Sequence, residues 1–484
     1  MRKRSWAFLI LFLFSWACFG NPPTRAAALP GGALLEATEG LAQYEVEAAF
    51  SPAQSQLNCR QTLIWSNPTG QTQEAVYLRV YANAFQTVET SPVGKGRMKT
   101  LCYGPAGFDA GGLTLDVVKV NGMAASWSYE DAAQTVLRIE TPGWAAGETR
   151  VVRLMYRVRI PNCAYRFGHA GDVWTLGNVF PQMALWDGEA WRLDPYGPIG
   201  DPFFHDCANW RVTLRTPPGY RAAGSGSRVR ESGYRTVFEA PAVREFALVI
   251  GKYGSMIEQR AGDTLVRVYA PTAEKAEACA EIAAQALELF ERWYGPYPWP
   301  SLDIASVEFP YGGMEYPGLL MIREEAFDQT ETLARVTAHE IAHQWFYGLV
   351  GNDPVREPWL DEALATFSEL LYVQYTEGDE ALRQIMETEI APSRTASANP
   401  GLASGSGIED FGDLYTYGQL VYRRGCAMMW DLYETMGEQT LSKALQGYIA
   451  AHAFGLATRE DFAQALEAAT GKDWHDFLAE YLDP

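Results

Sequence analysis

The chain has 484 residues, of which 48% are hydrophobic and 20% charged, an ordinary composition for a globular protein that excludes a wholly disordered chain. Its formal net charge of −20 opposes sequence-independent binding to nucleic acid and electrostatic docking on anionic lipid, because both need a basic surface. The length exceeds that of one small domain, so two or three folding units are expected.

The N-terminus is predicted to be an export signal. Residues 2–4 are basic, and an apolar run follows from Trp6 to about Phe19, too short for a bilayer span and typical of a signal peptide. We therefore interpret residues 1–28 as a signal peptide or membrane anchor, with lipid attachment at Cys18 as an alternative. The protein is expected to be exported, either secreted or held at the cell surface, with no other contact to a membrane.

Six further cysteines are compatible with disulfides in an exported protein. None of them shows CxxC spacing, which argues against a zinc site made of thiolates. The sequence alone does not determine pairing. We favour Cys163 with Cys207, because both lie in loop-like sequence of one domain.

Residues 35–254 are predicted to form an antiparallel β-sandwich domain. Short runs of alternating apolar and polar residues are separated there by Gly, Pro, Asn and Asp, as is typical of half-buried strands and their turns. The runs are Gln43–Ala49, Gln61–Trp65, Ala75–Val80, Val151–Val158, Trp210–Arg215 and Phe246–Ile250.

Residues 256–484 are predicted to form a second, mostly helical domain with a small sheet, so the fold class is multidomain α+β. Apolar residues recur at helical spacing from Ala273 to Tyr294 and through most of the sequence beyond Glu331. The segment Ala391–Gly407, rich in Pro, Ser, Ala and Gly, is predicted to be a long surface loop. The remaining expected elements are strands at Leu265–Tyr269 and Leu302–Glu308, and helices at Arg459–Ala469 and Trp474–Leu482.

A metal site is predicted from the sequence His339-Glu340-Ile341-Ala342-His343, which has the HExxH pattern of zinc metalloproteases. Two histidines four residues apart lie on one face of a helix, so both imidazoles can reach one ion. Glu340 lies at the edge of that face, close enough to activate a water without being a ligand. Such a motif also occurs by chance in helices, so a further ligand is needed.

Glu362 supplies that ligand. It follows His343 after 18 residues, in a helical segment beyond the turn-rich sequence Gly351-Asn352-Asp353-Pro354. Two imidazoles and one carboxylate leave the fourth position of a tetrahedral zinc open for water, as in catalytic sites. The sequence therefore predicts one zinc ion. Glu369, two turns further on, either orients a ligand histidine or is a plain surface charge.

Several motifs together resemble the aminopeptidase N family of gluzincin metallopeptidases, which also includes leukotriene hydrolase. The most specific is HExxH, 18 residues and Glu, and the resemblance extends over most of the chain from about residue 40. The other matching segments are Leu78–Phe85 in the β-rich half, Gly312–Gly318 (similar to GxMEN), Tyr422–Gly425 (similar to Tyr-x-Lys-Gly), Thr458–Phe462 and Gly471–Trp474.

The resemblance implies a thermolysin-like catalytic domain behind the β-sandwich, and it implies roles for individual residues. Glu315 would bind the α-amino group of the substrate, and a buried carboxylate does pair strongly with an ammonium. The backbone of Gly312, Gly313 and Met314 would run beside the substrate as an edge strand. Tyr422 would stabilise the oxyanion through its hydroxyl.

Two positions depart from the family pattern. The Asn expected after Glu315 is Tyr316, and Leu176–Gln182, the segment aligned with a second amine-binding acid, contains no acid. Amine recognition is therefore expected to rest on Glu315.

The sequence thus favours a zinc aminopeptidase that acts on peptides, in which Glu340 is the general base for attack by water. One alternative is a zinc endopeptidase, or another hydrolase, that needs no free N-terminus. Another is an exported zinc-binding protein without turnover, although binding alone requires neither Glu340 nor Tyr422. The oligomeric state cannot be predicted.

Overall fold

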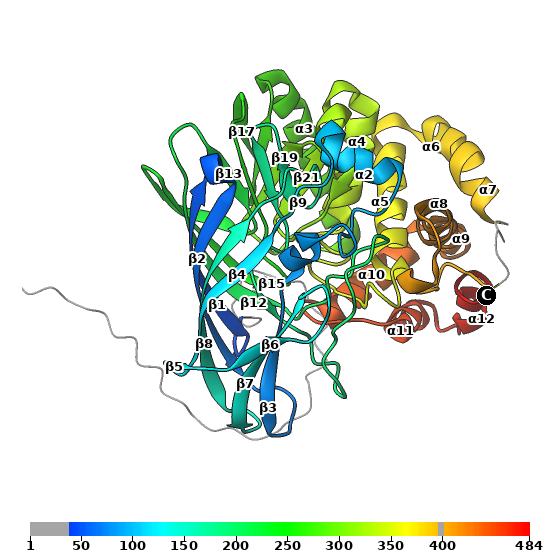
Figure 1. Ribbon diagram of the computed structural model, residues 1–484. Coiled ribbons are helices and arrows are strands. Elements are labelled where there is room, and N and C mark those ends of the chain that lie inside the picture. The colour runs from blue at the N-terminus through cyan, green and yellow to red at the C-terminus, as the bar shows by residue number, and fades with distance from the viewer. Residues whose placement is uncertain (1–37, 395–400) are drawn as a thin grey trace, which may run out of the picture.

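The computed structural model describes residues 38–394 and 401–484; the predicted signal segment lies outside them. The first half of the described chain is rich in strands, and the second half is mostly helical, with the sheets on one side of the molecule and the helices on the other (Figure 1). The predicted α+β class with a β-rich N-terminal region is therefore confirmed.

The largest sheet has eight strands. Side chains alternate between its faces, so that Tyr44, Val46 and Ala48 of the first strand are buried while their neighbours are exposed or half-buried. The strands, in spatial order, are β14 (Ser227–Ser232), β15 (Arg235–Val243), β12 (Ala208–Arg215), β1 (Ala42–Ser51), β2 (Gln56–Ser66), β8 (Thr149–Arg159), β4 (Gly112–Val120) and β5 (Met123–Ala124).

One pair of strands contradicts the prediction of a purely antiparallel arrangement. β1 pairs with β12 in parallel, whereas the other neighbours in this sheet are antiparallel. Parallel neighbours require a long connection, and here the chain leaves the sheet after β8 and returns much later beside its first strand. Hydrophobic alternation reports which face a residue lies on, but it carries no information about strand direction.

Two smaller antiparallel sheets complete the β-rich half. Their inward side chains join those of the large sheet in one apolar core that includes Leu78, Leu137, Leu176 and Leu248. The first sheet contains β13 (Arg221–Gly224), β16 (Leu248–Gly251), β10 (Val173–Leu176) and β9 (Phe167–Ala170), and the second contains β11 (Gln182–Met183), β3 (Gln73–Arg79), β7 (Val136–Trp144) and β6 (Trp127–Tyr129).

The predicted pairing of Cys163 with Cys207 is wrong. Both are free thiols in the structure, and both are buried. Burial, followed by the neighbouring Cys102 thiol, raises the pKa of Cys163. Loop-like sequence was a poor guide, because a disulfide depends on how close two Cα atoms lie across the fold.

A five-stranded mixed sheet begins the second half of the chain, and β20 lies at its edge. The three central strands run parallel, and every residue of β19 is buried because both faces of the sheet are covered. In spatial order the strands are β17 (Ser255–Ala261), β18 (Thr264–Ala270), β19 (Ser301–Val307), β21 (Leu319–Arg323) and β20 (Gly313–Met314).

Apart from α2, the helices lie in the same half of the chain as this sheet. Helix α3 (Ala273–Tyr294) has the predicted bounds, because the Thr272 hydroxyl accepts a hydrogen bond from Lys275 N at its start and Gly295 follows its end with φ 98°. The other helices are α2 (Arg97–Tyr103), α4 (Thr330–Ala342), α5 (Trp359–Glu377), α6 (Asp379–Ile385), α7 (Ala391–Arg394), α8 (Leu414–Tyr417), α9 (Gly425–Met436), α10 (Glu438–His452), α11 (Arg459–Thr470) and α12 (His475–Leu482), with π-helical turns at Met386–Ile390 and Gly418–Arg424.

The predicted loop at Ala391–Gly407 is partly wrong. Ala391–Arg394 forms α7, which continues the helical path of α6 and the π-helical turn. Residues 395–400 lie outside the described part of the chain, and turns follow from Gly401. Across the described residues, none of the helices has the length and apolarity needed to cross a bilayer.

A buried polar network connects the two halves. The Glu245 carboxylate, fully buried just before β16, accepts hydrogen bonds from the Asn178 amide and the Tyr347 hydroxyl, and the Tyr316 hydroxyl donates to Asn178 Oδ1 over 3.0 Å. Arg244 adds a hydrogen bond of 2.7 Å from Nε to the Tyr347 carbonyl. The network thus fixes residues from the strand-rich half against the chain just before and just after α4.

This network predicts a dependence of stability on pH. Burial raises the pKa of Glu245 from 4.5 to about 8, so the folded protein keeps a proton that the unfolded chain releases. Unfolding is therefore favoured increasingly between pH 4.5 and 8, at about 1.4 kcal/mol per pH unit. Glu245→Gln is expected to remove that slope, because Gln does not ionise, and its Oε1 can accept from the Asn178 amide while its Nε2 donates to the Tyr347 hydroxyl oxygen.

The measurement is the free energy of unfolding of both proteins by urea across this pH range. Glu438→Gln, at the exposed start of α10, is the control and should follow the wild type. Parallel pH curves for wild type and Glu245→Gln would contradict the buried, protonated state of Glu245.

Candidate active site

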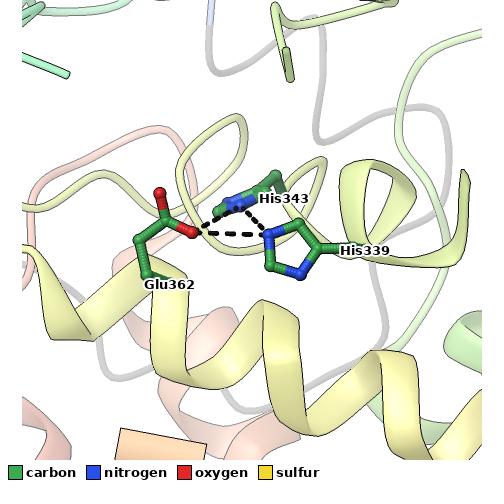
Figure 2. A group of neighbouring side chains, drawn as sticks. All are labelled: His339, His343 and Glu362. Atoms are coloured by element: carbon green, nitrogen blue, oxygen red, sulfur yellow. Dashed lines mark hydrogen bonds and ion pairs between the residues drawn. The ribbon is translucent and has the colours of Figure 1, made fainter. Parts of the chain in front are cut away.

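Three predicted metal ligands meet between α4 and α5 (Figure 2). His339 lies in the last turn of α4, His343 directly follows that helix, and Glu362 lies in the first turn of α5. The two Nε2 atoms are 3.2 Å apart, and Oε2 of Glu362 is 3.4 Å from His339 Nε2 and 3.3 Å from His343 Nε2. The helical spacing and the returning helix therefore bring all three to one point.

These separations fit a zinc ion. Ligands at about 2.0–2.1 Å from a tetrahedral zinc lie about 3.3 Å from one another, as these three atoms do. Oε2 of Glu362 is buried without a hydrogen-bond partner among the described residues, which is costly unless a cation supplies the contact. Two imidazoles and a carboxylate are also ligand types that zinc prefers.

Neighbouring groups orient both imidazoles. His343 Nδ1 donates to the Phe346 carbonyl over 3.1 Å, and His339 Nδ1 lies 3.5 Å from Oε2 of Glu369. Glu369 is in turn held by Arg335, whose Nε donates over 2.6 Å. With both Nδ1 atoms engaged in this way, both Nε2 lone pairs point at the common site. Of the two readings of Glu369, the geometry favours the one that orients a histidine.

Glu340 lies beside this group without joining it. Its side chain is buried, it lines the same cavity, and its Oε2 has no hydrogen-bond partner among the described residues. Burial raises the pKa of Glu340 to about 7, against the opposing charges of His339 and His343. A carboxylate with such a pKa can accept and return a proton near neutrality.

Gly313 makes room for this carboxylate. A Cβ atom at Gly313 would lie 2.5 Å from Oε1 of Glu340, so only glycine lets the edge strand β20 approach it. The predicted edge position of the Gly312–Met314 segment agrees with the sheet order, in which β20 is terminal.

Tyr422 reaches the metal ligands from a third element, the π-helical turn Gly418–Arg424. Its hydroxyl donates to Oε1 of Glu362, and its ring stacks on His339 with centroids 5.9 Å apart. Short π-helical turns are rare and are found frequently at functional sites. The structure therefore places this hydroxyl at the edge of the metal site, against one of the three residues that could hold the ion.

Glu315 follows β20 and lines the same cavity. Its carboxylate is buried and has no hydrogen bond or ion pair with the described residues. Burial raises the pKa of Glu315 well above its usual range, which means that its charge needs a cation it does not find within the protein. A substrate ammonium would supply that cation.

Gln344 holds this segment in place, which the sequence analysis missed. Its amide donates to the carbonyls of Glu315 and Tyr316, each over 3.3 Å, and its Oε1 accepts from Gly318 N over 2.8 Å. Gln344 directly follows His343, so its place beside the HExxH motif was the only available signal.

Tyr316 points away from the cavity. Its fully buried hydroxyl joins Asn178, and a Cβ atom at Gly177 would lie 1.9 Å from the same hydroxyl. The departure from the family's Asn is thus matched by space at Gly177, and Tyr316 supports the strand from behind.

Asp201 is another acid that lines the cavity, and sequence reasoning missed it. It comes from the strand-rich half, lines the cavity with Glu315, and forms an ion pair with the buried guanidinium of Arg166. Burial raises the pKa of Asp201, although Arg166 opposes this. Its sequence, Gly200-Asp201-Pro202, resembles an ordinary turn, and only the fold brings it near Glu315.

The site is one cavity of about 870 Å³, within the usual range for ligand sites. It contains the metal ligands and the side chains of Glu315, Glu340 and Tyr422. The predicted site residues, which are distributed over more than 100 positions of the chain, are therefore brought together.

Comparison with known proteins identifies this region. Residues 278–481 match the family described as Peptidase family M1 domain. Aminopeptidase N of Lactobacillus delbrueckii subsp. lactis is 30% identical over 255 residues, 49% of this chain and 30% of that protein. Aminopeptidase M1 of Arabidopsis thaliana is 28% identical over 303 residues, 57% and 34% of the two chains, and human glutamyl aminopeptidase is 26% identical over 289 residues, 54% and 30%. The chain thus spans about a third of the length of these curated relatives.

Proposed function

We infer that this chain, a member of the aminopeptidase N family through its peptidase family M1 domain, removes N-terminal residues from peptides in a zinc-dependent reaction. The observation that carries this inference is the juxtaposition of a three-ligand metal site and the unpaired, buried carboxylate of Glu315 in one cavity. A site for an ammonium at a fixed distance from the metal selects the first peptide bond of a substrate.

His339, His343 and Glu362 would hold the ion. When bound, zinc would polarise the scissile carbonyl and lower the pKa of nearby water. Glu340 takes the proton of the attacking water and delivers it to the leaving nitrogen, so the peptide bond breaks while one water is consumed. Tyr422 turns its hydroxyl from Glu362 to the developing oxyanion, and the backbone of Gly312–Met314 aligns the peptide.

Three finer features belong to the same proposal. The second half of the chain, which contains α4, α5 and the mixed sheet, is compatible with a thermolysin-like catalytic domain behind a β-sandwich. The metal is zinc, which the ligand set and spacing support. The protein is exported, for which the basic start and apolar run at the N-terminus are the support.

The deciding experiment compares one set of peptides with free and with acetylated N-termini, incubated with zinc-loaded protein and analysed by mass spectrometry. Stepwise loss of single residues from the free peptides alone is expected. Internal cleavage of both forms would replace the aminopeptidase with an endopeptidase, and retained zinc without cleavage would indicate a binding protein.

Two acids of the cavity, Glu315 and Asp201, are proposed to contribute unequally to binding of the substrate amine. Glu315→Gln is expected to lower kcat/KM on free-amine peptides by about 100-fold, because a buried charge-assisted pair is lost. Asp201→Asn is expected to cost only about tenfold, because Arg166 already neutralises part of its charge.

Steady-state kinetics of both variants on one tripeptide measures these effects, with zinc content confirmed for each. Equal rates for Glu315→Gln and wild type would contradict the role of Glu315.

A further inference from the structure

The active-site cavity contains three arginines, and only one of them lacks a carboxylate partner. Arg166 pairs with Asp201, and Arg335 pairs with Glu369 over 2.6 Å and Glu389 over 2.9 Å. Arg423 also lines the cavity but forms no ion pair or hydrogen bond with the described residues. Residues 395–400, outside the described part, contain no acidic side chain.

Arg423 belongs to the helical segment that also carries Tyr422. Tyr415, Gln419, Tyr422 and Arg423, spaced four, three and one residues apart, all line the cavity. The Tyr422 hydroxyl contacts Glu362 of the metal site, and Arg423, the next residue in the chain, lines the same cavity.

Arg423 lies on a different side of the cavity from Glu315, the residue proposed to bind the substrate amine. Glu315 lies at the end of β20, the edge strand, whereas the Ser393 hydroxyl donates to Gln419 Oε1 over 2.8 Å and lies 3.4 Å from the Glu389 carbonyl. Arg423, one turn beyond Gln419, is therefore near the Glu389 side. A peptide with its amine at Glu315 and its first carbonyl at the metal extends its leaving part over this side of the cavity.

We propose that Arg423 binds a carboxylate of the substrate on the leaving-group side of the scissile bond. A guanidinium is always charged and matches a carboxylate with two parallel hydrogen bonds. Among the described residues, Arg423 is the arginine of this cavity without a carboxylate partner, so its charge is free to bind an anionic group there. The carboxylate comes from the C-terminus of a short peptide or from an acidic side chain after the cleaved residue. This inference rests on the proposed function.

The test measures kcat/KM of zinc-loaded protein on di-, tri- and tetra-alanine with free and with amidated C-termini. Comparison of Ala-Glu-amide with Ala-Gln-amide tests the second source of the carboxylate, an acidic side chain after the cleaved residue. For the wild type, kcat/KM on at least one carboxylate-bearing substrate is expected to exceed kcat/KM on the matching neutral substrate, so that the ratio of the two values is about ten. The length with the largest ratio identifies where the carboxylate lies.

Arg423→Gln is expected to bring that ratio close to one while rates on the amidated peptides stay within about twofold of wild type. Arg423→Lys should keep the charge but only part of the ratio, because an ammonium cannot form the paired hydrogen bonds. Arg383→Gln is the matched control: it removes one positive charge from exposed α6, where Arg383 pairs with Glu380 and Glu387.

Equal rates on free and amidated substrates of every length and on both dipeptide amides, or a ratio that survives in Arg423→Gln, would overturn the inference and leave the aminopeptidase intact. Should Arg423→Gln fold poorly by circular dichroism, the wild-type ratio and that of Arg423→Lys decide. Zinc-loaded protein that cleaves none of these peptides, the neutral amides included, would overturn the proposed function and this inference together.

Discussion

Glu340→Gln is expected to lower kcat by roughly 10²- to 10⁴-fold, the usual contribution of a general base. The amide has the size of the carboxylate, so the space beside Gly313 stays filled and the metal ligands are untouched. It cannot take a proton from water, however, because it lacks the basic oxygen that Oε2 supplies. Turnover is therefore lost while zinc is retained.

Two measurements check this result: kcat on an unblocked tripeptide, and zinc content after dialysis. Glu288→Gln, an exposed residue of helix α3 that does not line the cavity, serves as the control and should stay near the wild-type rate. A Glu340→Gln protein that turns over at the wild-type rate would sink the assignment of Glu340 as the base.

Glu362→Ala is expected to abolish stable metal binding. The change removes one of three ligands and leaves two imidazoles, so affinity should fall by more than the 10- to 100-fold typical of changes to groups that merely orient a ligand. It also removes the acceptor of the Tyr422 hydroxyl. Zinc should consequently no longer raise the melting temperature, since that rise depends on binding to the folded state.

Atomic absorption after dialysis and thermal melts with and without added zinc give the two readouts. Glu377→Gln, at the exposed end of the same helix α5, is the matched control. Wild-type metal content in Glu362→Ala would show that the ion is held elsewhere.

The features that could be predicted from the sequence are those that local geometry determines. His339 and His343 share a helix face because of their spacing, and α3 has the predicted bounds because its caps lie beside it in the chain. The position of Glu362 could also be predicted, because it depends only on a turn and a returning helix. The resemblance to aminopeptidase N then assigned Glu315 and Tyr422, whose place in the cavity the structure describes.

The features that escaped prediction depend on long-range packing. Asp201 reaches the cavity only because the strand-rich half lies against β20. The Tyr316 side chain can point away from the cavity because Gly177 leaves space for its hydroxyl. The parallel pairing of β1 with β12 and the separation of Cys163 from Cys207 are likewise set by topology. Hydrophobic periodicity contains no information of this kind.

The Glu245 network has a consequence for the modularity of this chain. Tyr347 adjoins Phe346, whose carbonyl orients His343, and Tyr316 adjoins Glu315. Glu245, from the strand-rich half, bonds Tyr347 directly and reaches Tyr316 through Asn178. The helical half therefore depends on the strand-rich half for the positions of its site residues, and a domain that replaced the strand-rich half would have to supply equivalent buried hydrogen bonds.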